Sequence, residues 1–217
     1  MAIPATIQGI LWDNDGLLVD TERLYFAANR QVLQKAGIEL TPDRFREVSL
    51  RQGRSLLDLA RMAGRPEHEV LALRRERDGV YSAMLRSGVR VFPGVEWTLE
   101  RLRRLGLRMG IVTSAQRVHF EVMHARSGLL PYFEFVLALG EYRASKPSPA
   151  PYQEGLVKLR LPPQNVLVVE DSERGLSSAT AAGLRCVMVP NDQTRGGNFS
   201  RAAAVVSEVS GIARLIE

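Results

Sequence analysis

Residues Gln8–Glu22 read QGILWDNDGLLVDTE, and the rest of the chain is interpreted from this stretch. An apolar run is followed at once by Asp13, then by Asp15 and Gly16. Carboxylates at the edge of an apolar core require a metal ion, a cationic partner or hydrogen bonds. The stretch therefore predicts a buried strand over Thr6–Trp12 that ends in a catalytic site.

The bulk composition is that of an ordinary globular protein. With 217 residues, the chain is long enough for one large domain or a main domain with an insert. No apolar run approaches the roughly 20 residues of a membrane span, and the first residues lack the basic and apolar parts of a secretion signal. The single cysteine, Cys186, cannot form an internal disulfide, so we expect a cytoplasmic protein.

The basic balance raises the question of a nucleic-acid partner. The net charge is +5 and the pI about 9.8, but the basic residues are nearly all arginines spread along amphipathic patterns such as Glu100–Leu105. The sequence contains no basic run interleaved with aromatic residues and no zinc-finger spacing. Solvated helix faces explain the charge better, and we expect a monomer that binds neither nucleic acid nor membrane.

Two patterns divide the chain. Between Asp20 and Ser87 the apolar spacing predicts helices only, one of which begins with Thr41 as N-cap. After Val91, helices and strands alternate, which is typical of a parallel sheet with helices on both faces. The predicted fold class is therefore α/β, with a Rossmann-like parallel sheet core (residues 1–17 and 89–217) flanked by helices and an inserted all-helical cap (residues 18–88).

Polar residues recur where the predicted strands end, and the carboxyl ends of parallel strands meet at one edge of a sheet. Clustered carboxylates repel one another, and Mg²⁺ with oxygen ligands removes that conflict. A lysine and hydroxyl groups suit the remaining oxygens of a phosphate. The pattern predicts a Mg²⁺ and phosphoryl site with a carboxylate nucleophile, formed by Asp13, Asp15, Thr113, Ser114, Lys146, Glu170 and Asp171.

Four motifs in order carry a family resemblance: WDNDGLLVDTE (Trp12–Glu22), GIVTSA (Gly110–Ala115), SKPSP (Ser145–Pro149) and VVEDSERGLSSATAAG (Val168–Gly183). With them the chain resembles the haloacid dehalogenase-like hydrolase superfamily. The resemblance is to the branch with a helical cap inserted after the first motif, which includes β-phosphoglucomutase and phosphoglycolate phosphatase-type enzymes.

The resemblance implies a role for each motif residue. Asp13 would be the nucleophile that forms an aspartyl-phosphate, and Asp15 the general acid and base. The Thr113 hydroxyl and the Ser114 amide would hold phosphate oxygens, and Lys146 would neutralise the phosphate and the nucleophile.

The resemblance also implies the metal ligands. Mg²⁺ would bind the Asp13 carboxylate, the Asp15 backbone carbonyl and Asp171, with Glu170 ligating the ion or orienting a water. Asp15 also separates the chain from the metal-independent dehalogenases of the superfamily, which lack this second aspartate.

The cap is expected to carry substrate contacts. The loop containing Gly53, Arg54 and Ser55 is the candidate for the part that faces the site, with Arg54 or Arg51 meeting a second anionic group. The alternative, a helix–helix turn with solvated arginines, fits the sequence equally well.

The expected activity is Mg²⁺-dependent hydrolysis of a small phosphorylated metabolite, such as a sugar phosphate or phosphoglycolate. The alternative is a phosphomutase resembling β-phosphoglucomutase. Those mutases carry a histidine near the position of Tyr25 and an arginine at that of Leu56, and both absences favour hydrolysis. A catalytically silent binding protein on the same fold is a third reading, against which the intact motifs argue.

Other polar residues are assigned structural roles. Asn14 is expected to point away from the site with little effect, and Asp20 to act as a helix cap and hinge. His119 and His124 are expected to be surface or packing residues, and His68 to be solvated.

Overall fold

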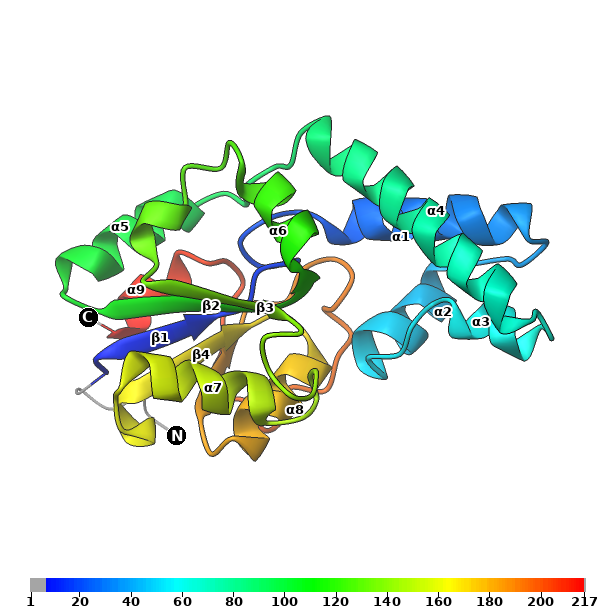
Figure 1. The fold of residues 1–217 in the computed structure, drawn as a ribbon. Helices are drawn as coiled ribbons and strands as arrows, with labels where there is room; N and C mark the ends of the chain where they lie inside the picture. Colours follow the sequence, from blue (N-terminus) through cyan, green and yellow to red (C-terminus); the bar gives the residue numbers. More distant parts are fainter. Residues whose placement is uncertain (1–6, 217) are drawn as a thin grey trace.

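The structure is a computed structural model that describes residues 7–216. Six parallel strands form one sheet in the order β3-β2-β1-β4-β5-β6, which confirms the predicted α/β class (Figure 1). The predicted strand start at Thr6 and the N-terminal segment inspected for a secretion signal lie outside the described residues. The strands are β1 (Gly9–Trp12), β2 (Arg108–Gln116), β3 (Phe135–Leu139), β4 (Val166–Glu170), β5 (Arg185–Met188) and β6 (Ala204–Val205).

Helices cover both faces of the sheet because successive side chains of a strand point to opposite faces. Ile10 and Trp12 of β1 are fully buried in one apolar cluster, while Leu11 between them is buried in the other. The first cluster is covered by α5 (Val95–Arg104), α6 (Arg117–His124) and α9 (Gly211–Ile216), and the second by α7 (Ala150–Leu159) and α8 (Glu173–Ala181). Short 3₁₀ turns lie at Leu130–Tyr132 and Pro163–Asn165.

Residues 20–87, between β1 and α5, form helices and the turns that join them, and no strand. The helices are α1 (Glu22–Lys35), α2 (Pro42–Phe45), the π-helix η1 (Arg46–Arg51), α3 (Asp58–Met62) and α4 (Glu67–Arg86). As predicted, Thr41 caps α2, and its hydroxyl accepts a hydrogen bond from the Arg44 amide at 3.2 Å. The turn predicted over Ser49–Ser55 begins later, because Val48, Ser49 and Leu50 are buried on η1.

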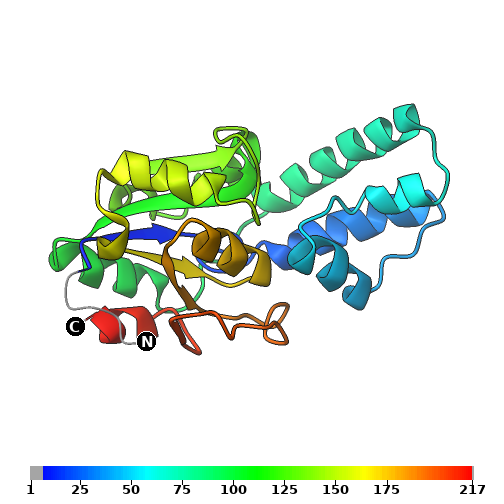
Figure 2. The same cartoon turned by 90° about the horizontal axis from the view of Figure 1, so that it is seen from below.

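The cap lies at the carboxyl ends of the strands, whereas α9 lies near their opposite ends (Figures 1 and 2). The two connections of the cap to the sheet run side by side. Val19 pairs with Val91 in an antiparallel bridge, and the Asp20 amide donates to the Arg90 carbonyl at 2.9 Å. The connections therefore hold the cap over the edge of the sheet where the predicted site residues lie.

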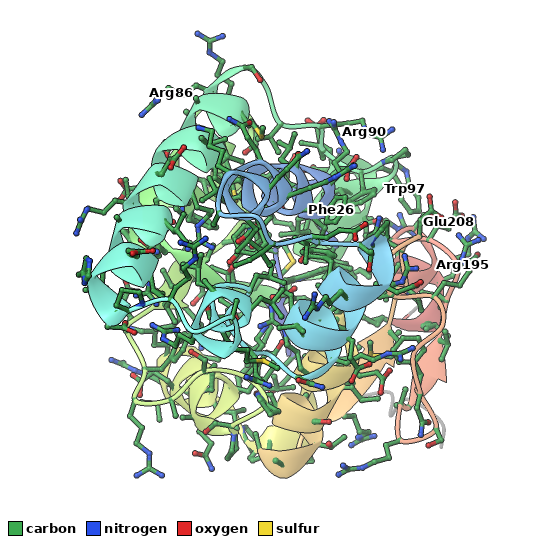
Figure 3. All side chains as sticks on the ribbon, turned by 90° about the vertical axis from the view of Figure 1, so that its right-hand side faces the viewer. Phe26, Arg86, Arg90, Trp97, Arg195 and Glu208 are labelled. Atoms are coloured by element: carbon green, nitrogen blue, oxygen red, sulfur yellow. The ribbon has the colours of Figure 1, made fainter. Side chains whose placement is uncertain are left out.

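Three of the exposed arginines lie far from one another in the view onto the cap. Figure 3 shows Arg86, Arg90 and Arg195 well apart around the outline of the molecule. Arg90 forms an ion pair with Asp20, and Arg195 with Asp192. Within residues 7–216, no helix has the length and apolar character needed to cross a membrane.

Candidate active site

Lys146 is the cationic centre of the site. Its ammonium group donates to Asp13 Oδ1 at 2.6 Å, to Glu170 Oε1 at 2.7 Å and to the Val112 carbonyl at 2.9 Å, which uses all three of its hydrogens. The side chain is almost fully buried. Burial disfavours the charged ammonium, but the Asp13 and Glu170 carboxylates outweigh this effect and raise the pKa of Lys146 above its usual value. Lys146 therefore stays protonated.

Glu170 is the most firmly held carboxylate. Besides Lys146, its Oε1 accepts from the Tyr152 hydroxyl at 2.7 Å, and its Oε2 accepts from the Ser172 hydroxyl at 3.1 Å and the Asp171 amide at 3.2 Å. Burial alone would raise the pKa of Glu170, but Lys146 and the hydrogen bond from Tyr152 lower it. Glycine is required at position 175, since a Cβ there would lie 1.9 Å from the Glu170 carboxyl carbon.

Three buried carboxylates meet beside Lys146. Oxygens of Asp13, Glu170 and Asp171 lie within 4.8 Å of one another. Burial, and then the charge of Glu170, raise the pKa of Asp13 to about 7 against the opposing effect of Lys146. Burial and the neighbouring charges of Asp13 and Glu170 also raise the pKa of Asp171 well above its usual value. One ammonium does not balance this cluster, so the cluster favours a further cation.

The donor set fits a hard divalent cation. All candidate ligands are oxygens, and the acids carry excess negative charge, which is the environment that Mg²⁺ prefers. Asp13 and Asp171 each accept few hydrogen bonds from the protein, whereas both oxygens of Glu170 are occupied. Glu170 is therefore better placed to orient a water or a neighbouring ligand than to bind the ion directly.

Asp15 is held by three donors. The Thr21 hydroxyl donates to its Oδ1 at 2.6 Å, and the Thr113 hydroxyl and the Asn14 amide donate to its Oδ2 at 3.0 and 3.2 Å. Thr113 thus directs its hydroxyl to Asp15 here. Asn14, expected to point away from the site with little effect, is not a residue of the cavity wall described below, but its fully buried side chain contacts Asp15 and also His124.

A cavity of about 270 Å³ lies between the sheet and the cap. Of the predicted site residues, the ones on its wall are Asp13, Asp15, Ser114, Gly53, Arg54 and Ser55. Ser114 lies in the segment between Val112 and Gln116, where the pairing of β2 with β3 is irregular. Its buried hydroxyl makes no hydrogen bond with residues 7–216, so it can donate to a ligand.

The cap loop approaches the core at Lys146. Gly53 has a φ of +65°, and a Cβ there would lie 3.2 Å from the Lys146 carbonyl oxygen. Arg54 follows on the cavity wall, whereas Arg51 lies outside this cavity and pairs with Glu173 of α8 at 3.4 Å. The structure thus separates the two arginines that the sequence could not distinguish.

Several residues of the site escaped the sequence analysis. Thr21, and not Asp20, is the N-cap of α1, and Asp20 instead forms ion pairs with Arg23 and Arg90. Glu22 lies on the cavity wall, where burial and then Asp15 raise its pKa to about 8. Tyr152, Arg74, Arg77 and Arg174 were also missed. Thr21 and Glu22 belong to the stretch Gln8–Glu22, but the sequence pattern there indicated only the start of a helix.

Comparison with known proteins decides the family. A sequence model of haloacid dehalogenase-like hydrolases matches residues 10–189. The chain belongs to this family. Its motif residues Asp13, Lys146 and Glu170 lie within the matched range and form the hydrogen-bonded centre described above.

Two relatives and one solved structure match most of the chain. The chain is 30% identical to the protein CbbY of Rhodobacter capsulatus over 221 residues, covering 95% of this chain and 96% of the relative. It is 31% identical to the phosphorylated carbohydrates phosphatase of Thermotoga maritima over 183 residues, covering 82% of each. The crystal structure of CbbY from Rhodobacter sphaeroides in complex with phosphate has a TM-score of 0.81 at 24% identity, covering 95% of this chain and 96% of that one. This haloacid dehalogenase-like hydrolase is a phosphoric monoester hydrolase that acts on small phosphorylated molecules.

Proposed function

We propose that the chain is a Mg²⁺-dependent phosphatase that hydrolyses a small phosphorylated metabolite, such as a sugar phosphate, through an aspartyl-phosphate on Asp13. The observation that supports this most is the position of Asp13. It lies on the cavity wall, accepts a hydrogen bond from Lys146 at 2.6 Å and belongs to the carboxylate cluster.

In the first step an Asp13 carboxylate oxygen attacks the phosphorus atom. The bond from phosphorus to the leaving oxygen breaks, and protonated Asp15 gives its proton to that oxygen. Lys146 orients Asp13 and stabilises negative charge on the transferring group, while the Ser114 hydroxyl and amide are placed to bind its oxygens.

In the second step a water molecule attacks the phosphorus atom of the aspartyl-phosphate. Asp15 accepts the proton of this water, the bond from phosphorus to Asp13 breaks, and inorganic phosphate leaves. Thr21, Thr113 and Asn14 hold Asp15 for both steps.

The metal would be held by the Asp13 and Asp171 carboxylates and the Asp15 backbone carbonyl, with Glu170 orienting a water. When bound, Mg²⁺ neutralises charge that builds up on the phosphoryl oxygens. The excess of buried carboxylates over cations supports this assignment.

The cap gives less support to a phosphomutase. Tyr25 lies on the cavity wall, but its hydroxyl is hydrogen-bonded to Arg77 at 2.7 Å. Leu56 is fully buried in the apolar core of the cap. Neither position supplies the histidine or arginine of β-phosphoglucomutase, so transfer to water is the favoured outcome.

Phosphate release from a panel of phosphomonoesters, with Mg²⁺ or with EDTA, tests the proposal. Release should require Mg²⁺ and should be lost in Asp13→Asn and Asp15→Ala. Asp192→Asn is the control, because the Asp192 side chain is 90% exposed and does not line the cavity. Activity in Asp13→Asn, or in EDTA, would reject the proposal, and coupled formation of glucose 6-phosphate from β-glucose 1-phosphate would favour the mutase.

A further inference from the structure

Arg174 is a cation on the cavity wall that the proposed chemistry does not use. It lies in the first turn of α8, and its Nε atom is buried without a hydrogen-bond partner. Among residues 7–216 its guanidinium forms no ion pair within 4.0 Å. Buried donors are nearly always hydrogen-bonded in folded proteins, so the exception indicates a partner from outside the chain.

The cap supplies two more arginines to the same cavity. A Cβ on Gly53 would lie 3.5 Å from Cδ of Arg174, so the alkyl stem of Arg174 lies against the cap loop. Arg54 follows Gly53, and its Nε lies 3.4 Å from Asp58 Oδ2. Arg74 of α4 is exposed and forms no hydrogen bond or ion pair with the described residues. Arg54, Arg74 and Arg174 are called the arginine wall below.

Acids do not cancel the charge of the arginine wall by direct pairing, apart from the long contact of Arg54 with Asp58. Beyond Asp13 and Asp15, the acids that line the cavity are Glu22 and Asp78. Asp78 accepts a hydrogen bond from Arg77 at 2.7 Å, and Glu22 forms no ion pair in the part of the chain that the structure describes. Arg77 itself is occupied by Asp78, Tyr25 and Asn29.

We propose that the arginine wall binds a second anionic group of the substrate, so that the enzyme prefers phosphorylated metabolites that also carry a phosphate or a carboxylate. The inference rests on the proposed function, which places the phosphoryl group to be removed at Asp13. A guanidinium matches both kinds of anion because its N–H groups form paired hydrogen bonds with two oxygens.

The position of the wall gives the second anion a further effect. Arg174 belongs to the core, whereas Arg54 and Arg74 belong to the cap, so an anion bound between them joins the two parts. Such an anion stabilises the closed cap, which excludes water from the reacting group. Binding energy from a remote part of the substrate then raises kcat/KM at the reacting centre.

The test compares kcat/KM within matched substrate pairs that differ in the second anion. The phosphate arm uses ribulose 1,5-bisphosphate with ribulose 5-phosphate and fructose 1,6-bisphosphate with fructose 6-phosphate, and the carboxylate arm uses phosphoglycolate with ethyl phosphate. The variants are Arg174→Met, Arg174→Lys and Arg74→Met. Arg75→Met is the matched control, since Arg75 is exposed on the same helix and lies outside the cavity.

In the wild-type enzyme, at least one pair should favour the doubly anionic member by about tenfold or more, the range expected for a charge-assisted hydrogen bond. Arg174→Met should reduce this ratio at least about fivefold, mainly through KM, and Arg174→Lys should restore part of it. Arg75→Met should keep the wild-type ratio. The arm that responds distinguishes a second phosphate from a carboxylate.

Two results would overturn the inference. One is a ratio near unity for every pair in the wild-type enzyme. The other is an equal loss for both members of a pair in Arg174→Met, because Arg174 would then act on the transferring phosphoryl group. Failure of the proposed function would give a different result. Asp13→Asn would then retain activity, whatever the ratio of kcat/KM between the two members of a substrate pair.

Discussion

The His124 Nε2 atom lies 2.7 Å from the Asn14 Oδ1 atom, and the amide nitrogen of Asn14 donates to Asp15. Because the Asn14 nitrogen is the donor, its oxygen must accept, so Nε2 of His124 carries the proton. Nδ1 then accepts from the Ser127 hydroxyl at 2.8 Å. A neutral His124 therefore connects α6, through Asn14, to the proposed acid and base, although His124 and Asn14 are 110 positions apart in sequence.

Loss of this connection should reduce turnover without removing a group that touches the substrate. We expect Asn14→Ala and His124→Phe to lower kcat about tenfold, a part of the 10²- to 10⁴-fold effect typical of acid–base catalysis. Asn14→Ala removes one of the three donors to Asp15, and His124→Phe removes the hydrogen bond that orients the Asn14 amide. His68→Ala, at an exposed position, is the control. Steady-state kinetics measures the effect, and a change in KM alone would contradict the assignment.

The same histidine should make stability depend on pH. Burial lowers the pKa of His124 from 6.5 to about 4, so between these values the unfolded chain binds a proton that the folded chain does not. Lowering the pH through this window therefore favours unfolding, by up to about 3 kcal/mol at its lower end.

Asp13 and Glu22 act in the opposite direction, because their raised pKa values make the folded chain bind protons first. The measurement is therefore a difference in the free energy of unfolding between wild type and His124→Gln, from urea titrations. We expect the wild-type advantage to shrink by about 2 kcal/mol between pH 7.5 and 5. A difference that does not change with pH would show that His124 is not buried in its neutral form.

Asp171→Asn should stabilise the metal-free protein and abolish its response to metal. Burial and the charges of Asp13 and Glu170 disfavour the Asp171 carboxylate, and the amide removes that charge at almost equal volume. We expect a gain of about 1 kcal/mol in EDTA, little or no activity, and no rise in Tm on adding MgCl₂. Asp192→Asn serves as the control, and a retained Mg²⁺ shift in Asp171→Asn would remove Asp171 from the ligand set.

Gly175→Ala should damage the site without changing any polar group. The new Cβ would lie 1.9 Å from the Glu170 carboxyl carbon, so Glu170 must move away from Lys146. We expect a loss of about 1–3 kcal/mol of stability and at least about tenfold in kcat. Gly79→Ala is the matched control, because nothing lies within 4 Å of its Cβ and alanine favours the helix by about 1 kcal/mol. Equal thermal stability for the two variants would contradict the proposed clash.

The parallel sheet and the polar residues at the carboxyl ends of its strands could both be predicted from the sequence, and the reason is physical. Parallel strands bring their ends together, so residues such as Asp13, Lys146 and Glu170 could be placed in one site from chain order alone. The short polar segments after each strand also carried the family motifs. The observed contacts among these residues agree with that placement.

The contacts that sequence reasoning missed have no local pattern. Tyr152 and His124 lie on amphipathic helices, where the sequence pattern does not distinguish a functional polar residue from a packing residue. Only the fold brings Tyr152 to Glu170 and His124 to Asn14. The contact of Arg51 with Glu173 was equally hidden, because it depends on how the cap sits on the core. Periodicity reports which face of a helix is buried, but not which element covers it.

The paired connections at Val19 and Val91 bear on how such a protein can change during evolution. The chain leaves the sheet and returns to it at neighbouring points, held by one antiparallel bridge. Any inserted segment whose two ends lie about 5 Å apart, one strand spacing, can therefore replace the cap without altering the sheet. Under the proposed function, substrate preference can thus be exchanged as a module while the reaction chemistry is inherited unchanged.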